Sequence, residues 1–248
     1  MQIALSDNTM VCQTDTYGAY YYNPSVPNPG NAGVMGAWQQ LVTTNSMPSG
    51  DPALTVSARQ AFGALGVYAI AISPSDTSIF YMSWLGYLYK SSNKGQTWTN
   101  LNAKFTPVAY AKNNPNETNA PGDATFGPKM AIDPNNAEVV YFGLTGTGPP
   151  WYTLDGGTTW SQVGTGDLPS PSVASYSYAF GYAPGSSKVL YCFVNGIGCY
   201  KSTNAGSNST TWTKISGSGT STVALTSCRR LFVDSTGVVW VTDDSGSG

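Results

Sequence analysis

The apolar positions of this chain fall in short runs separated by Gly, Pro, Asn and Ser, and no stretch shows a convincing helical period of 3.6 residues. Such runs joined by turns are typical of antiparallel sheets. In the segment from residue 64 to 103, they predict four strands, near Tyr68–Ile72, Ile79–Ser83, Gly86–Lys90 and Thr97–Leu101. The pattern therefore predicts an all-β chain.

The hairpin that opens this segment recurs along the chain. Ala71–Tyr81 aligns with Ala131–Tyr141 and with Gly181–Tyr191, and each reads as a strand, a Pro-containing turn and a second strand. Ile3–Cys12 and Leu231–Val241 resemble shorter versions of the same hairpin. An internal repeat of about 40–50 residues is typical of β-propellers.

A second signature follows three of these hairpins. Ser91–Trp98 and Thr153–Trp160 fit the Asp-box pattern Ser/Thr-x-Asp/Asn-x-Gly-x-Thr-Trp, and Ser202–Trp212 fits it with three extra residues before Thr211. We expect the Asp or Asn to cap backbone N–H groups, the Gly to adopt a positive φ and the Trp to pack between blades. The residues given this structural role are Ser91, Asn93, Gly95, Trp98, Thr153, Asp155, Gly157, Trp160, Asn204, Gly206 and Trp212.

Together these repeats predict a β-propeller of four-stranded antiparallel blades with Asp-box turns. About four and a half blades fit in the chain, at about 1–45, 64–103, 126–165 and 176–217, with a half blade at 228–248. An unfinished blade leaves a strand edge open. We therefore expect 1–248 to form a single but incomplete propeller domain, completed by more of a longer protein or by other chains. The alternative is a closed five-bladed ring with a degenerate last blade.

Composition narrows the possible functions. Only 10% of the residues are charged and the net charge is −2, which excludes a basic surface for nucleic acid or membrane. No apolar run approaches the roughly 20 residues of a membrane span. The chain has no histidine, which excludes Ser-His-Asp and Cys-His catalysis and His-ligated metals, and its cysteine spacing fits no zinc motif. We expect no cofactor and no metal.

The N-terminus lacks the basic and apolar regions of a secretory signal. We expect either that a signal has been removed from this sequence or that export occurs in another way, for example as part of a virus particle. Cys192 and Cys199 flank the turn Asn195-Gly196, and a two-residue hairpin would place them opposite each other. They form either a cross-strand disulfide or a pair of small apolar residues on a blade face. The two-residue hairpin would make them a hydrogen-bonded cross-strand pair, whose side chains lie farther apart, and this disfavours the disulfide.

Two segments resemble glycoside hydrolase family 74, the endo-xyloglucanases. Thr14–Tyr20 resembles the family's Arg-Thr-Asp-x-Gly-Gly-Ala-Tyr motif, and Gly127–Asn136 resembles its Gly-Glu-Arg-Leu-Ala-Val-Asp-Pro-Asn-Asn segment. Val140–Gly143 and the Asp box ending at Trp160 follow in the family's order. The resemblance implies a seven-bladed ring and a second seven-bladed propeller across a substrate cleft.

The resemblance also implies a catalytic residue. Family members cleave β-1,4-glucans with inversion, using two aspartates, and the motif Asp, here Asp15, is the general base. Inversion needs two carboxyls about 6.5–9.5 Å apart, so Asp15 would supply half of the site and the second carboxylate would lie outside this chain. Gln13 replaces the motif's Arg and Tyr17 its first Gly, which would change the pKa and orientation of the carboxylate. An Asp at this place is also a common turn cap.

Three aromatic residues are candidates for stacking on sugar rings: Tyr20, Trp84 and Trp151. The two tryptophans are expected at loop tips, because Trp84 lies between two predicted strands and Trp151 follows Gly148-Pro-Pro. Long or exposed connections often carry binding residues.

These features favour an extracellular or virion-surface propeller that binds polysaccharide and, if catalytic, hydrolyses it as an inverting glycoside hydrolase. The alternative is a non-catalytic structural or host-recognition propeller of a phage tail or surface assembly. A sialidase needs three arginines from separate blades, and this chain has only Arg59 and the adjacent Arg229 and Arg230. A sortilin-like protein-binding propeller shares the Asp boxes, and no local feature excludes it.

Overall fold

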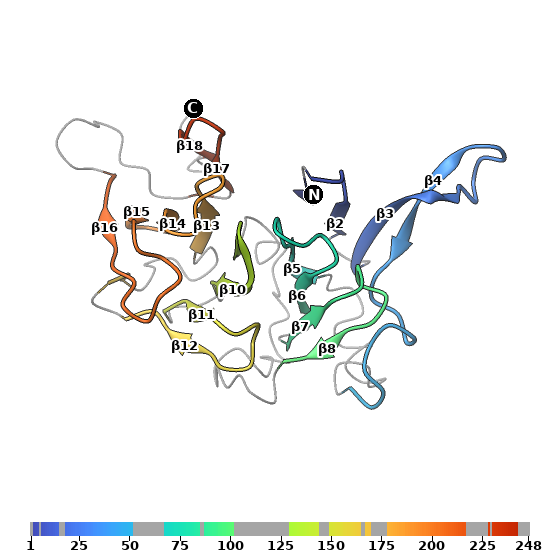
Figure 1. Ribbon diagram of the computed structural model, residues 1–248, viewed down its shortest axis with the longest axis horizontal. Helices are drawn as coiled ribbons and strands as arrows, with labels where there is room; N and C mark the ends of the chain where they lie inside the picture. The colour runs from blue at the N-terminus through green and yellow to red at the C-terminus, as the bar shows by residue number, and fades with distance from the viewer. Residues whose placement is uncertain are drawn as a thin grey trace. The chain divides into compact units, whose positions relative to one another are not determined.

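The computed structural model describes residues 2–4, 6–14, 18–51, 67–84, 87–101, 129–143, 149–164, 167–169, 178–216, 228 and 230–242. Within these ranges the chain forms strands and no helix, in four four-stranded antiparallel sheets and one two-stranded hairpin (Figure 1). The predicted fold class, an all-β chain of four-stranded antiparallel blades, is confirmed. No helix in the described part is long and apolar enough to cross a membrane.

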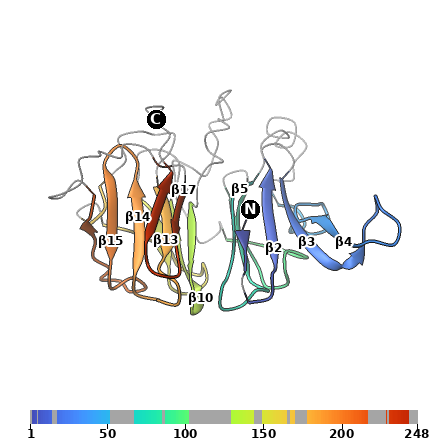
Figure 2. The same cartoon turned by 90° about the horizontal axis from the view of Figure 1, so that it is seen from above.

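The first compact unit, Met1–Thr118, holds two sheets in which neighbours in sequence are neighbours in space. The first sheet consists of β1 (Gln2–Ile3), β2 (Met10–Thr14), β3 (Gly18–Pro27) and β4 (Met35–Gln40). The second sheet consists of β5 (Val67–Ile72), β6 (Phe80–Trp84), β7 (Tyr87–Ser91) and β8 (Thr99–Asn100). Strands β2 and β5 lie side by side (Figure 2).

The second compact unit, Asn119–Gly248, holds two sheets and a hairpin. The third sheet consists of β9 (Met130–Asp133), β10 (Asn136–Phe142), β11 (Trp151–Thr153) and β12 (Ser161–Gln162). The fourth sheet consists of β13 (Tyr178–Tyr182), β14 (Leu190–Val194), β15 (Gly198–Ser202) and β16 (Thr213–Lys214), and the hairpin of β17 (Arg230–Val233) and β18 (Val239–Thr242). Strand β13 contacts both β9 and β17, so the fourth sheet lies between the third sheet and the hairpin (Figure 2).

The observed strands follow the repeat closely. In the second sheet every strand begins and ends within two residues of its expected bounds. Each sheet, and the final hairpin, falls inside one of the expected blade ranges. The treatment of 1–248 as one domain, and the number of blades in the complete ring, stay predictions.

Cross-strand register assigns equivalent positions to the sheets. We call one side of each sheet the front face. It carries the pairs Cys12–Tyr20, Met82–Tyr89, Phe142–Trp151 and Cys192–Tyr200. The opposite side is the back face. The aromatic residue of each pair also pairs with a residue in the last strand of its sheet. A tryptophan lies two positions before that residue in every sheet: Trp38, Trp98, Trp160 and Trp212.

Within each unit, a back face packs against the next front face. Val11 and Ala19 on the back of the first sheet pack with Phe80 and Met82 on the front of the second. Burial of a Phe or Met side chain is worth about 1.5–3 kcal/mol. The same arrangement joins the third sheet to the fourth, through Tyr141, Phe180, Leu190 and Cys192, and the fourth sheet to the hairpin, through Tyr191, Phe193, Leu231 and Val233.

Candidate functional site

The segment Ser91–Trp98 forms a turn that its own side chains hold together. Gly95 N donates to Ser91 Oγ at 2.9 Å, and Thr97 N donates to Asn93 Oδ1 at 2.9 Å. The φ of Gly95 is +77°, a conformation that favours glycine. The side chains of Ser91 and Asn93 therefore satisfy backbone donors that the turn would leave unpaired.

The segment Thr153–Trp160 repeats these bonds with an aspartate. Gly157 N donates to Thr153 Oγ1 at 2.9 Å, and Thr159 N donates to Asp155 Oδ1 at 2.8 Å. Desolvation acts to raise the pKa of Asp155, but hydrogen bonds from Thr159 and Thr153 outweigh it and lower the pKa.

The stretched segment Ser202–Trp212 keeps the central bond despite its three extra residues. Thr211 N donates to Asn204 Oδ1 at 2.8 Å, and Asn204 Nδ2 donates to Ser209 O at 2.9 Å inside the insertion. Gly206 has a φ of +73° and its N–H donates to Tyr141 Oη at 3.0 Å. These contacts support the interpretation of all three segments as structural turns.

Trp98 and Trp212, which end the first and third of these segments, face neighbouring sheets. Trp98 Nε1 donates to Leu41 O at 2.9 Å, and its ring is buried in the cluster between the first and second sheets. Trp212 lies edge-on to Tyr141 at 6.3 Å between ring centroids, between the third and fourth sheets. We expect these side chains to stabilise the blades rather than bind ligand.

Asp15, the candidate general base, lies outside the described residues. The strands on either side of it are well anchored: β2 ends at Thr14, β3 begins at Gly18, and these two residues pair. Next to them Val11 and Ala19 are fully buried. Its role as a base stays a prediction.

The three candidate sugar-stacking residues all lie on front faces. Tyr20 and Trp151 occupy the register position of Tyr89 and Tyr200, which are buried. Trp84 is the last residue of β6 and is only 8% exposed, with its ring 6.2 Å from that of Tyr89.

Trp84 thus differs from the expected exposed loop tip. Strand β6 extends one residue farther than expected, and Trp84 follows Met82 at the strand period of two, so its ring turns into the same core. That period was the sequence signal for its burial.

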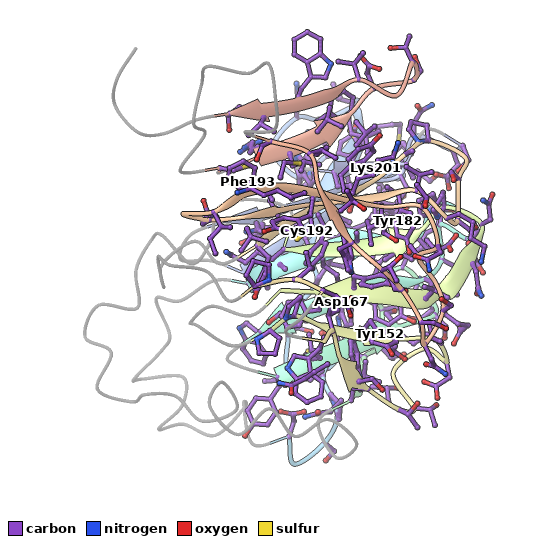
Figure 3. All side chains as sticks on the ribbon, turned by 90° about the vertical axis from the view of Figure 1, so that its left-hand side faces the viewer. Tyr152, Asp167, Tyr182, Cys192, Phe193 and Lys201 are labelled. Atoms are coloured by element: carbon purple, nitrogen blue, oxygen red, sulfur yellow. The ribbon has the colours of Figure 1, made fainter. Side chains whose placement is uncertain are left out.

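Of the two alternatives for Cys192 and Cys199, the structure has the pair of buried residues without a cross-strand disulfide. The turn has three residues, because Val194 pairs with Gly198, so Cys192 pairs with Tyr200 and Phe193 pairs with Cys199. This one-residue offset places the two thiols on opposite faces, with Cys192 toward the third sheet and Cys199 toward the hairpin. Both cysteines are free, and Cys192 lies among the stacked strands of the second unit (Figure 3).

Two buried polar groups were not expected from the sequence. Asp51 accepts hydrogen bonds from Tyr89 Oη at 2.9 Å and from Asn100 Nδ2 at 2.8 Å. Lys129, just before β9, is 3% exposed, and burial lowers its pKa to about 8. Lys129 aligns with the Arg of the family 74 segment, and this match could have singled it out in the sequence. Asp51 carries no motif that would have singled it out.

No group of three or more His, Cys, Asp or Glu side chains that could hold a metal ion occurs among the described residues. Described polar side chains such as Asn93 and Asp155 hold turns together, and Asp133 links two sheets.

Comparison with known proteins gives partial matches to one class of enzyme. No known protein-family profile matches the chain. An alignment of 122 positions that covers 43% of the chain gives 32% identity to a xyloglucanase of Hypocrea jecorina, of which it covers 13%. An alignment of 211 positions that covers 74% of the chain gives 25% identity to a xyloglucanase of Paenibacillus sp., of which it covers 19%.

Among solved structures, the family 74 glycoside hydrolase of Niastella koreensis matches with a TM-score of 0.67 and 22% identity, over 100% of this chain and 33% of that one. This likeness shows that the sheets are blades of a β-propeller. The sequence matches show that the chain resembles the xyloglucanases of family 74. It spans less than a fifth of the length of these two relatives, at 13% and 19%.

Proposed function

We propose that this chain is part of a β-propeller that binds and hydrolyses polysaccharide, as an inverting endo-β-1,4-glucanase acting on xyloglucan. The observation that carries the proposal is the sequence similarity to xyloglucanases from two organisms, combined with the Thr14–Tyr20 motif. The propeller fold alone would not select this function, since many functions share it.

In this proposal Asp15 is the general base that removes a proton from the attacking water. A carboxylate in this role must keep a fixed distance from the acid on the other side of the sugar ring. Pairing of Thr14 with Gly18 and burial of Val11 and Ala19 fix the strands that flank Asp15. The acid would come from a part of the protein outside this sequence, so a second propeller or another chain completes the site.

The three aromatic candidates for sugar contact do not support the proposal equally. Tyr20 and Trp151 are half-buried and remain candidate sugar contacts, whereas Trp84 is buried. Because Tyr20 and Trp151 share the register of the buried Tyr89 and Tyr200, we expect their substitution to affect stability as well as binding. A polysaccharide substrate also supports an extracellular setting, secreted or on a virion surface.

The test is release of reducing ends from xyloglucan and other β-glucans by the whole protein and by Asp15→Asn. Removing a general base costs about 10²–10⁴-fold in rate, so the variant should lose at least 100-fold. The matched control is Asp167→Asn, which changes a half-buried carboxylate in a short turn after β12. Full activity of Asp15→Asn would contradict its role as base. Binding of xyloglucan without release by any variant would favour the non-catalytic, host-recognition propeller.

A further inference from the structure

A glycine closes the connection between β2 and β3, the two strands that flank the candidate base. Thr14, the last residue of β2, pairs with Gly18, the first residue of β3, so three residues connect the strands (Figure 2). The φ of Gly18 is +89°. Three-residue hairpin turns typically end in a residue with positive φ, which is most often glycine. Gly18 therefore has the backbone conformation that such a turn needs at its end.

The need for glycine at position 18 comes from the backbone rather than from a lack of space. The nearest described atoms to a Cβ added there are Cβ and Cγ2 of Val42, at 3.8 and 4.0 Å. These distances are ordinary van der Waals contacts. An alanine at this position would therefore fit, but its φ would be strained or would have to change.

The strand that follows Gly18 is held in place and has little freedom to relieve such strain. Ala19 is fully buried and packs in the cluster between the first and second sheets. Its carbonyl accepts a 2.8 Å hydrogen bond from Leu41 N, and on the other side it pairs with Gln13 of β2. Because Ala19 is held on both sides, a change of φ at Gly18 should displace the turn rather than the strand.

The fourth sheet contains a turn of the same kind. Strands β14 and β15 pair up to Val194 and Gly198, which leaves three residues between them, and Gly198 has a φ of +135°. Asn195 is the first of these three residues. It corresponds by register to Asp15 in the first sheet.

The side chain of Asn195 has a fixed direction. Asn195 is 1% exposed, and its Oδ1 accepts a 2.7 Å hydrogen bond from Cys228 N, just before the β17–β18 hairpin. Its Nδ2 donates to Cys228 O at 3.4 Å. A three-residue turn closed by a glycine can thus hold its first side chain toward one particular group.

We propose that Gly18 is a positioning residue for the general base, because its positive φ closes the turn and so sets the place of the Asp15 carboxylate. This inference rests on the proposed function, in which Asp15 takes a proton from the attacking water. A base acts only within hydrogen-bonding reach of that water, and a displacement of about 1 Å can cost about 100-fold in rate. Gly18 touches no reacting atom and acts through Asp15.

The experiment measures kcat and KM for xyloglucan with the whole protein and with its Gly18→Ala variant. We expect kcat to fall about 10–100-fold and KM to stay within about twofold, because the base acts in the chemical step. Gly33→Ala is the matched control. Gly33 lies between β3 and β4 with a φ of +84°, and nothing lies within 4 Å of an added Cβ. This control should lower the melting midpoint about as much as Gly18→Ala does and leave kcat unchanged.

Two further variants separate positioning from a general loss of stability. In the Asp15→Asn protein, Gly18→Ala should cause no further loss of kcat, because the group that it positions is already gone. Gly18→Asn should keep more activity than Gly18→Ala, because asparagine adopts a positive φ more readily than alanine. Gly18→Asn also keeps the test open if Gly18→Ala does not fold.

Two results would overturn the inference while the proposed function stands. One is a Gly18→Ala protein with the kcat of the wild type. The other is an equal loss of kcat from Gly18→Ala in the wild type and in Asp15→Asn, which would show that Gly18 acts independently of Asp15. A wild-type protein that releases no reducing ends would contradict the proposed function itself and this inference with it.

Discussion

Asp133 Oδ1 accepts a 2.6 Å hydrogen bond from Ser187 Oγ and so joins the first turn of the third sheet to the first turn of the fourth. Asp7 Oδ2 accepts a 2.7 Å bond from Thr77 Oγ1 between the first and second sheets. Thr77 and Ser187 occupy the same position of the aligned hairpins. A carboxylate-to-hydroxyl bond between turns therefore accompanies the apolar packing of these blades.

Loss of the Asp133–Ser187 bond should destabilise the second unit. Asp133 is 2% exposed, and removing one partner of a buried charged hydrogen bond costs about 1.5–3 kcal/mol. Urea unfolding of Asp133→Ala, Ser187→Ala and the double variant measures the coupling between them, which should be about 1–2 kcal/mol. Effects that simply add would show that the two side chains act independently.

Asp7 should contribute stability that is lost in acid. Desolvation acts to raise its pKa, but hydrogen bonds from Thr77, Thr9 and Lys94 lower it well below its ordinary value of 3.8. Because the folded pKa is below the unfolded one, the contribution is present above about pH 4 and disappears as pH falls from there toward the folded pKa.

Unfolding midpoints at about pH 6 and about pH 3 check this prediction. Asp7→Asn should lower the midpoint at the higher pH and have a smaller effect at the lower one. Lys94→Met, which removes the 3.1 Å ion pair with Asp7, should act in the same direction. Because Asp7 is exposed, we expect modest shifts. A variant that loses equal stability at both pH values would contradict the assignment.

Gly95 should resist substitution more than Gly185, another glycine with positive φ. A Cβ added there would lie 2.5 Å from Leu41 Cδ2 and 3.2 Å from Trp98 Cζ2, at a φ of +77°. Gly95→Ala should cost about 2–4 kcal/mol from strain and overpacking together. Gly185 is the matched control, because its φ is +70° and nothing lies within 4 Å of an added Cβ. Gly185→Ala should cost about 1 kcal/mol, and equal costs at both positions would contradict the crowding at Leu41.

Lys129 should lower stability at neutral pH. Burial lowers its pKa from 10.5 to about 8, against a smaller opposite effect of Cys228. Between these values the unfolded chain binds more protons, so stability should rise with pH across that window. Lys129→Met should stabilise the protein by about 1–3 kcal/mol near pH 7 and flatten this rise.

Lys201→Met is the control for that measurement, because Lys201 lies over the Tyr191 ring at 5.6 Å and is half-buried. It removes a lysine charge while Lys129 stays in place, so the rise in stability with pH that we assign to Lys129 should persist. A rise that persists in Lys129→Met would show that another group causes it.

The strands could be predicted from the sequence because each is short and belongs to a local hairpin that recurs along the chain. Ala71–Tyr81, Ala131–Tyr141 and Gly181–Tyr191 each span the turn of one observed hairpin and part of both of its strands. The turn bonds of Asn93 and Asp155 are also local, within a few residues of sequence. Local geometry of this kind follows directly from residue type.

The face of the sheet on which a side chain lies and the register between paired strands were harder to predict. A three-residue turn at Asn195–Ile197 in place of a two-residue one shifts the register by one and separates Cys192 from Cys199. For Trp84 the strand period indicates the face on which the ring lies, but not the cluster between the sheets that buries it. The pairings of Asp51 with Tyr89 and of Asp133 with Ser187 join residues far apart in sequence, and composition does not reveal them.

The measurement that tests the central proposal most directly is electrophoresis of the native protein through gels with and without xyloglucan. A protein that binds this polysaccharide should migrate more slowly in the gel that contains it, while a non-binding reference protein keeps its mobility. Equal mobility in xyloglucan, other β-1,4-glucans and plain gel would contradict a polysaccharide-binding propeller.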